Sequence, residues 1–190
     1  MRKSSLILLT LITLFICCKK EEQKIERYPY LIEKDQVGKL KKGATVSDLD
    51  SIFSKDSIVT RIGEGDYMFA DEDRYIIYDS IGKHLFTLTP SEQHDNNAKI
   101  ENIQIFDNRF RTEKKLTIQS TFSDIKNNYT ISKIENTFNN IIIFVDDIDA
   151  YFTIDKNELP KNIQYNLDAK IDSTVIPDNA RIKYFMIGWE

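Results

Sequence analysis

Side chains that could carry acid–base or metal chemistry gather in two acidic clusters of the sequence. The first, Asp-Glu-Asp, spans residues 71–73, and the second, Asp-Asp-Ile-Asp, spans residues 146–149. Two carboxylates about 5–10 Å apart can hydrolyse a glycosidic bond, and carboxylate oxygens also bind calcium. Neither cluster has the spacing of an EF-hand loop, and Asp is favoured in hairpin turns because it hydrogen-bonds the local backbone. We therefore expect both clusters to be solvated turns.

Other catalytic or metal-binding groups are scarce. His84 follows a predicted turn and His94 lies in the polar segment 91–97, so we expect both imidazoles to be exposed and to form no site. The sequence has no Gly-x-Ser-x-Gly, His-Glu-x-x-His or phosphate-binding glycine motif, and the Gly-Glu-Gly at 63–65 fits a turn. We therefore predict a protein that is not an enzyme, with no catalytic residue, no metal and no cofactor.

The N-terminal segment has the pattern of a signal peptide. Arg2 and Lys3 precede an apolar run of 11 residues, 6–16, which ends at two adjacent cysteines. A membrane-spanning helix needs about 20 apolar residues, whereas a signal-peptide core needs about 7–15. No later segment approaches the length of a span, so we expect residues 1–17 to be a cleaved signal.

A signal segment that ends in cysteine resembles a bacterial lipoprotein signal peptide, in which the cysteine thiol is acylated, palmitate included, and becomes the mature N-terminus. Cys18 is the better candidate because the small Cys17 precedes it, and Cys17 is the alternative. The next residues, Lys19-Lys20-Glu21-Glu22, resemble the export signal of Bacteroidetes-type surface lipoproteins, with an ordinary charged tether as the alternative. The resemblance implies an anchor in the outer membrane that faces the cell exterior, or alternatively the periplasm.

Composition limits the remaining function classes. The chain has 190 residues, of which 41% are hydrophobic and 29% charged, so it can form a packed core. Loss of residues 1–17 removes Arg2 and Lys3, which takes the net charge from −4 to −6 over 173 residues. This mild acidity, without a basic cluster, argues against a nucleic-acid partner. No cysteine follows residue 18, so the body cannot rely on disulfides.

Three blocks of the body recur in the same order, with offsets of 76, 66 and 82 residues. Chance similarity between apolar strands could produce one such match but hardly all three, and an overlooked repeat leads to the wrong fold. We therefore expect an internal duplication. The matching blocks are 45–53 with 121–129, 75–78 and 85–88 with 141–144 and 151–154, and 97–105 with 179–187.

The repeated blocks predict a helix followed by a hairpin and a final strand. Thr45 with Asp48, and Thr121 with Asp124, have the spacing of a capping box. Apolar residues then recur at i, i+3 and i+7, which predicts a helix of about ten residues with one apolar stripe. The hairpin blocks are rich in β-branched and aromatic residues, as strands are.

These elements predict an α+β fold of two tandem related units, each a short helix packed on a small antiparallel sheet of three to four strands. We expect a signal peptide at 1–17, a flexible tether at 18–29, unit 1 at 30–109 and unit 2 at 110–190, with both units packed as one body. At the level of architecture only, this plan resembles the β-lactamase inhibitor protein and the small outer-membrane assembly lipoproteins. No motif of either is present, so the resemblance implies no function.

The two units differ in two inserted segments. Unit 1 has 10 extra residues around 61–74, and unit 2 has 16 extra within 155–177, where alternation at 163–167 could indicate an added strand. Long loops on a rigid scaffold are frequent sites of recognition, although drift in exposed loops is the alternative. The candidate binding residues in these loops are Glu64, Asp66, Tyr67, Asp71, Asp73, Tyr165 and Asp168.

Asp-Ser followed by Ile or Thr occurs at residues 50–52, 56–58, 79–81 and 172–174. This pattern resembles the O-glycosylation sites of exported Bacteroidetes proteins. Ser51 lies within a predicted helix, so Ser80 and Ser173, in a turn and a loop, are the expected acceptors.

We therefore predict a lipid-anchored envelope protein that contacts the membrane through its lipid and binds a protein or glycan partner without catalysis, as an inhibitor or as an accessory of an envelope complex. Two alternatives stay open. One is a carboxylate-dependent hydrolase acting on surface glycans, which needs two acidic side chains in one cleft. The other is an immunity lipoprotein, which differs only in the identity of its partner.

Overall fold

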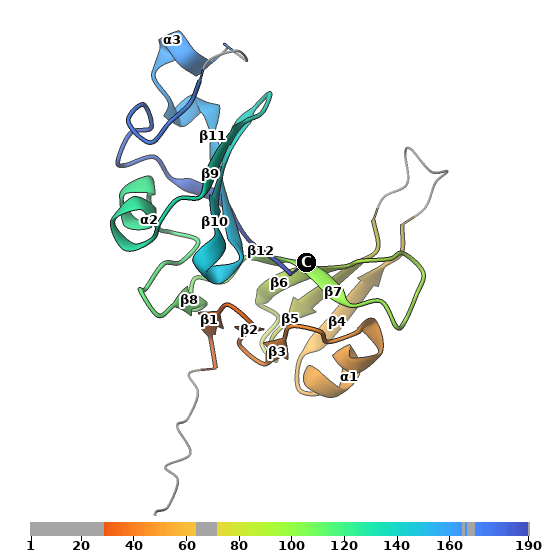
Figure 1. The fold of residues 1–190 in the computed structure, drawn as a ribbon. Coiled ribbons are helices and arrows are strands. Elements are labelled where there is room, and N and C mark those ends of the chain that lie inside the picture. Colours follow the sequence, from red (N-terminus) through yellow and green to blue (C-terminus); the bar gives the residue numbers. More distant parts are fainter. Residues whose placement is uncertain (1–28, 64–71, 165, 167–169, 190) are drawn as a thin grey trace, which may run out of the picture.

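The computed structural model describes residues 29–63, 72–164, 166 and 170–189, and its larger sheet has eight antiparallel strands (Figure 1). The strand order is β4-β5-β6-β7-β12-β11-β10-β9. The strands are β4 (Ser57–Arg61), β5 (Arg74–Tyr78), β6 (His84–Pro90), β7 (Ile100–Ile105), β9 (Lys133–Asn136), β10 (Asn140–Val145), β11 (Ala150–Asp155) and β12 (Ile182–Gly188).

The fold is α+β, but the expectation of two separate small sheets is wrong. The last strand of each half, β7 and β12, pair with each other in antiparallel register, with Ile105 opposite Phe185. This pairing joins the strands of residues 57–105 to those of residues 133–188 in one continuous sheet. Pairing satisfies the backbone groups that two edge strands would otherwise expose, which is why the halves merge.

A second, small sheet was not predicted. Its strands are β1 (Leu31–Glu33), β2 (Gln36–Val37), β3 (Leu40–Lys41) and β8 (Arg111–Thr112), in the order β3-β2-β1-β8. Strands of two or three residues are too short to show a period of two in the sequence. They nevertheless bury Ile32, Val37 and Leu40 completely, so the small sheet contributes to the core.

The helices begin where the sequence predicts, but they are shorter. A 3-10 turn, η1 (Val46–Asp48), leads into α1 (Leu49–Ile52), and α2 spans Phe122–Asn128. In both, the carboxylate three residues on accepts hydrogen bonds from the amide and hydroxyl of the capping threonine. The distances are 2.9 and 2.8 Å for Thr45 to Asp48, and 2.7 and 3.0 Å for Thr121 to Asp124.

The remaining helical turns follow β10 and β11, and the last of them corrects one sequence-based expectation. Residues 146–149 form a 3-10 turn, η2 (Asp146–Ile148), with Asp149 in the left-handed conformation at φ 48°. After β11 the chain forms η3 (Lys156–Glu158) and a short helix, α3 (Lys161–Gln164). The alternation at 163–167 therefore does not mark an added strand where the structure describes it, because Ile163 lies in α3.

The core is a row of large apolar side chains that crosses the whole eight-stranded sheet. One residue from each strand takes part, in successive register pairs. The six central members are at most 1% exposed. Burial of this row, at roughly 25 cal/mol per Å² of apolar surface, supplies much of the driving force for folding. The row is Ile58, Ile77, Phe86, Ile105, Phe185, Phe152, Ile143 and Ile134.

The residues that the structure describes cover only one face of the eight-stranded sheet. Figure 1 shows the sheet bent near β7 and β12, with α1, α2 and the small sheet all on its convex side. The buried faces of the helices, among them Leu49, Phe122 and Ile125, pack against the core on that side. The concave side faces the open space between the two arms of the sheet, and we call it the open face.

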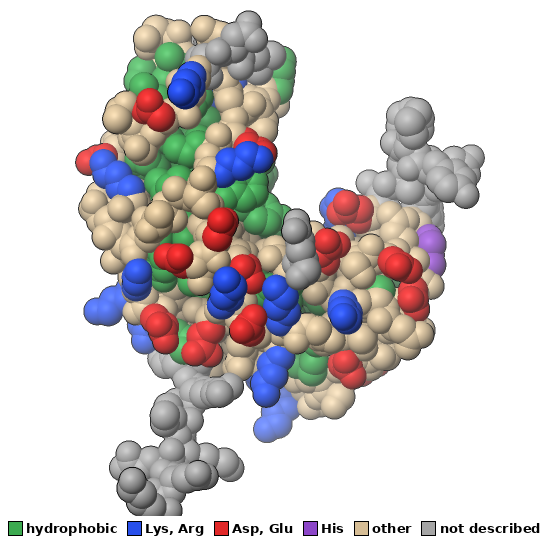
Figure 2. All heavy atoms as spheres, viewed as in Figure 1, with side chains coloured by type: hydrophobic (Ala, Val, Ile, Leu, Met, Phe, Trp, Pro, Cys, Tyr) green, Lys and Arg blue, Asp and Glu red, His purple; other side chains and the backbone are tan. Residues whose placement is uncertain are grey.

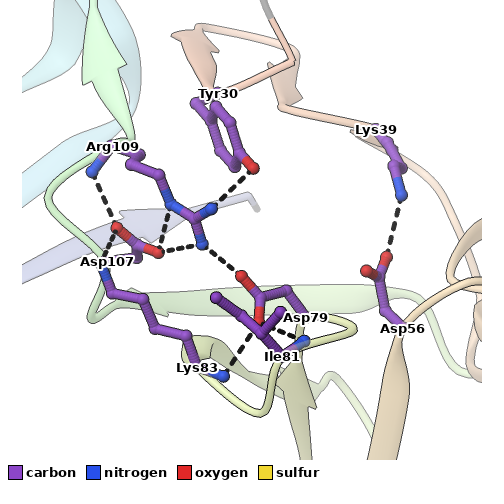
Figure 3. A network of polar contacts seen from close by, with 8 residues as sticks. All are labelled: Tyr30, Lys39, Asp56, Asp79, Ile81, Lys83, Asp107 and Arg109. Atoms are coloured by element: carbon purple, nitrogen blue, oxygen red, sulfur yellow. Dashed lines mark hydrogen bonds and ion pairs between the residues drawn. The ribbon is translucent and has the colours of Figure 1, made fainter.

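A polar network ties the small sheet to the large one (Figure 3). The Arg109 guanidinium donates to Asp107 from Nε at 2.8 Å, to Asp79 from Nη2 at 2.5 Å and to the Tyr30 hydroxyl from Nη1 at 2.9 Å. Lys83 Nζ also donates to Asp107 at 3.0 Å. Asp107 is fully buried, so these donors replace the water that its carboxylate gives up.

We expect stability to fall in acid because two buried carboxylates have lowered pKa values. Burial alone would raise the pKa of Asp107, but hydrogen bonds from Arg109 and Lys83 bring it below the ordinary value of 3.8. For Asp73, hydrogen bonds from the His94 and Gly63 amides likewise outweigh burial. A carboxylate whose pKa is lower in the folded state contributes stability above its unfolded pKa, and this is lost as pH falls through the folded pKa.

The urea midpoint should therefore stay level from about pH 7 to 5 and fall progressively below about pH 4. Asp107→Asn should lower the midpoint at neutral pH and flatten the acid slope. A midpoint that stays unchanged down to about pH 2.5 would show that neither carboxylate titrates with unfolding.

Candidate functional site

The open face carries apolar and aromatic side chains where a solvated sheet face would carry polar ones. Each member of its middle row is the chain neighbour of a core-row residue, following it on one strand and preceding it on the next, because the strands are antiparallel. Every member of this row except exposed Val59 and Lys133 is half-buried. The row is Val59, Ile76, Thr87, Gln104, Met186, Tyr151, Phe144 and Lys133.

An aromatic cluster lies next to this row, over β5, β6 and the end of β7. The His84 ring stacks on Phe106, with centroids 3.8 Å apart, and lies 5.2 Å from the Tyr78 ring. Burial lowers the pKa of His84, so its imidazole is neutral at pH 7 and contributes to an apolar surface. The expectation that His84 is exposed is wrong, because this stacking half-buries it, whereas His94 is exposed as predicted.

Three large apolar side chains on the open face remain accessible. Val59 is 45% exposed, Phe106 43% and Tyr184 40%. They come from β4, the residue after β7, and β12, so they extend across the bend of the sheet. Figure 2 shows this side of the molecule as a groove between two arms, with apolar side chains along the inner edge of the arm that carries β9–β12.

A hollow of about 500 Å³ lies at one end of the open face, beside the turn at 146–149. The Tyr151 hydroxyl donates to Asn102 Oδ1 at 3.0 Å within it. Burial, together with Glu72 and Glu101, raises the pKa of Tyr151, so the phenol stays protonated and keeps this hydrogen bond. Gly188 leaves room for the ring, because a Cβ there would lie 3.3 Å from Tyr151 Cε1.

Charges mark the two ends of the open face. At the β4 end, Arg61 and Arg74 are register partners, both are exposed, and neither has an ion-pair partner among the described residues. At the β9 end, Lys133 is paired with Glu135 on its own strand. The uncompensated charge at the β4 end of the open face, beside Val59, is therefore positive.

The acidic clusters do not form a paired-carboxylate site in the described parts of the chain. Asp73 is 1% exposed and accepts from the amides of Gly63 at 2.8 Å and His94 at 2.6 Å, so its prediction as an exposed binding residue is wrong. Asp149 is paired with Lys42 at 3.2 Å and Lys34 at 3.5 Å. Asp146 and Asp147 are exposed, as expected for a solvated turn.

Several other predicted residues lie outside the described residues. These are the lipidation candidates Cys17 and Cys18, the export signal at 19–22, and the loop candidates Glu64, Asp66, Tyr67, Asp71, Tyr165 and Asp168. Ser80 and Ser173 are described, and both are exposed.

Metal-ligand clusters and membrane-spanning helices are two features of the geometry that bear on function. Among the residues that the structure describes, no three His, Cys, Asp or Glu side chains lie together as metal ligands would. No helix in those same residues is both long and apolar enough to cross a membrane.

Comparison with known proteins identifies a similar fold and no family. No protein-family model matches the chain, and no curated protein matches it significantly. Among solved structures, the chain is similar to the uncharacterized protein yfeY from Escherichia coli. The TM-score is 0.53 at 8% identity, over 83% of this chain and 98% of that one. At such identity the similarity shows the fold alone.

The open face was missed in the sequence, although it left a signal there. The strand blocks 75–78 and 141–144 are unbroken runs of apolar residues. Such runs place apolar residues on both faces of an antiparallel sheet. The exposed Phe106, directly after β7, and Tyr184, in β12, lie in the scaffold and not in the inserted loops.

Proposed function

We propose that this protein is a non-catalytic binding module whose open face docks another protein. The observation that carries this proposal is the exposed apolar surface of Val59, Phe106 and Tyr184 across the bend of the eight-stranded sheet. Contiguous exposed apolar surface on a soluble domain marks an interaction site, and aromatic residues contribute disproportionately to binding energy. A concave face suits a partner that presents an apolar projection.

The charges of the open face specify this partner further. Arg61 and Arg74 lie at the rim beside Val59 without a carboxylate partner of their own in the described parts of the chain. Rim charges steer association and select partners more than they add affinity. The occupant is therefore a folded protein whose apolar projection is flanked by Asp or Glu.

Cross-linking capture from intact cells tests this proposal. The double variant Phe106→Ala/Tyr184→Ala should reduce the yield of the cross-linked protein at least about tenfold, since two hot-spot aromatics contribute more than about 1.4 kcal/mol together. Ile81→Ala is the matched control, because Ile81 is 83% exposed but lies in the turn between β5 and β6.

Arg74→Glu should lower the capture yield most at low ionic strength, where rim charges act over the longest range. The proposal fails if wild type captures no specific protein, or if the double variant captures the same protein with the yield of Ile81→Ala.

We further propose that the body is anchored in the outer membrane by lipid at Cys18. The signal pattern at 1–17 and the charged residues that follow support this anchor. Two or more acyl chains anchor a protein stably, whereas one is marginal. Labelled palmitate should therefore be incorporated by wild type and lost in Cys18→Ala.

If the palmitate label is lost in Cys17→Ala and kept in Cys18→Ala, the lipid is attached to Cys17. Protease treatment of intact cells should digest the body if it faces the exterior, and full protection would favour the periplasmic face.

We also propose that the body is a tandem duplication, with units at 30–109 and 110–190. Matched contacts support this: the amide of Val46 donates to Ala98 at 3.0 Å, and that of Phe122 to Ala180 at 2.8 Å. Isolated bridges likewise pair Thr45 with Lys99 and Thr121 with Arg181. The strand order is also symmetric about the β7–β12 pair, as two copies joined at their last strands require.

The hydrolase alternative receives no comparable support. It requires two carboxylates that face one cleft. Asp73 is held by two backbone amides and Asp149 by two lysines. An immunity lipoprotein remains a special case of the docking proposal, since only the identity of the captured protein distinguishes it.

A further inference from the structure

A second hollow, of about 580 Å³, lies at the opposite end of the β10–β11 hairpin from the turn at 146–149. It forms where β10 begins and β11 ends, together with η3 and α3. This volume lies in the range of small-molecule sites, about 300–1,000 Å³. Its walls combine lysines, amide side chains and one aromatic ring.

The decisive residue is Lys156, which lines this hollow. Lys156 is only 4% exposed, and its Nζ has no hydrogen-bond partner among the described residues. A buried ammonium without a partner is costly, so lysines in such positions are nearly always paired. A bound anion would therefore stabilise the ammonium of Lys156, since none of the described residues supplies one.

The other charges of the hollow neutralise each other. Lys183 Nζ donates to Asp155 at 2.9 Å and to the amide oxygen of Asn140 at 3.2 Å. Asp155 and Lys183 both line the hollow, so their pair adds no net charge to it. One uncompensated positive charge, that of Lys156, remains for a ligand.

The rim of the hollow carries an aromatic ring and amide side chains, which can contact a ligand larger than a simple anion. Phe138 is 76% exposed and offers a free ring at the edge. The side chains of Asn139 and Asn157 are exposed beside it, and Gln164 lines the same wall. Amide groups both donate and accept hydrogen bonds, which matches the dual character of hydroxyl groups. An apolar ring face next to such amides suits a sugar ring, with its C–H face and its hydroxyls.

We propose that this hollow binds a carboxylated sugar, with its carboxylate paired to Lys156 and its ring against Phe138. The flexible four-carbon stem of lysine lets the buried ammonium turn toward a carboxylate in the hollow. The sugar hydroxyls form hydrogen bonds with the side-chain amides of Asn139, Asn157 and Gln164. This site does not depend on protein docking at the open face, because it draws on none of the exposed aromatic residues there.

Titration calorimetry of the lipidated chain in detergent, with glucuronate as the probe, tests the site. Lys156→Met keeps the length of the side chain and removes its charge, and should weaken glucuronate binding at least about tenfold. The Lys156→Met substitution should not lower the urea midpoint, because it removes an unpaired buried charge.

Phe138→Ala, at an exposed position, should weaken binding several-fold without affecting folding. Lys161→Met, at an exposed lysine of α3, is the matched control and should bind like wild type.

Each remaining outcome overturns the proposal in a distinct way. No heat of binding with glucuronate at millimolar concentration rejects the site. Equal binding of N-acetylglucosamine rejects the role of the carboxylate, and equal binding of acetate rejects the sugar. Unchanged affinity in Lys156→Met or in Phe138→Ala rejects the assigned contacts. A separate loss of protein capture in the open-face variants would leave this result unaffected.

Discussion

Replacement of Phe185 with alanine is expected to reduce the free energy of unfolding by about 3–5 kcal/mol, the range for a fully buried aromatic residue. Phe185 is 0% exposed, lies between Ile105 and Phe152 in the core row, and has its ring centroid 4.6 Å from that of Phe152. It also belongs to β12, at the seam where the two halves of the large sheet meet. A cavity there removes contacts from both halves at once.

Urea unfolding followed by the fluorescence of Trp189, the one tryptophan of the chain, measures this loss. Trp189 is 4% exposed and its Nε1 donates to the Lys34 carbonyl, so its emission should report on the packed state. Phe185→Leu should cost less, about 1–1.5 kcal/mol, because it fills more of the cavity. Phe138→Ala, at a position that is 76% exposed, should stay within about 0.5 kcal/mol of wild type. Equal losses for Phe185→Ala and Phe138→Ala would contradict the assigned core.

Arg109→Ala is expected to cost about 3 kcal/mol, because it leaves a buried carboxylate with too few partners. Asp107 is fully buried, and Arg109 supplies its Nε bond at 2.8 Å and a second contact from Nη2 at 2.5 Å. Lys83 remains at 3.0 Å and keeps the loss below that of a completely unpaired charge. The variant also loses the links to Asp79 and Tyr30 that connect the small sheet to the large one.

Arg181→Ala is the matched control for this network. Arg181 pairs with Glu158 at 3.3 Å, but its side chain is 80% exposed, and exposed pairs contribute about 0–1 kcal/mol. Arg109→Lys should reduce the free energy of unfolding by an intermediate amount, because a lysine ammonium cannot reach Asp107, Asp79 and Tyr30 together as the planar guanidinium does. If the urea midpoints of Arg109→Ala and Arg181→Ala agree, the network does not stabilise the fold.

Local signals in the sequence predicted six of the eight strands of the large sheet and the starts of its two helices, whereas β4 and β9 lie outside the predicted blocks. The capping pairs Thr45–Asp48 and Thr121–Asp124 lie at the starts of η1 and α2, and both hairpins occur in the expected blocks. These features depend on residues three to fifteen apart, so short-range propensity and hydrogen bonding decide them. Helix lengths were overestimated, because the apolar stripe continues at Phe53 and Tyr129 after the helices end.

The binding residues expected from the sequence and the exposed apolar surface of the fold lie in different parts of the chain. The sequence analysis placed the candidate binding residues in the inserted loops. Asp73, one of these candidates, is buried, and its carboxylate accepts hydrogen bonds from two backbone amides. The exposed Phe106 and Tyr184 lie in the scaffold, where a sequence does not distinguish a covered strand face from an uncovered one. Which face is covered depends on where the helices and the small sheet pack, and those contacts join residues far apart in the chain.

The sequence by itself was enough to predict the helix starts, the two hairpins, the repeat of blocks and the resemblance of the N-terminal segment to a lipoprotein signal, because each of these depends on residues close together in the chain. Only the tertiary structure decided that β7 pairs with β12 to make one bent sheet, that the described residues leave one face of this sheet open, and that Lys156 is buried without a partner among them. These features arise from contacts between residues distant in sequence, whose closure entropy is offset only when the whole core assembles.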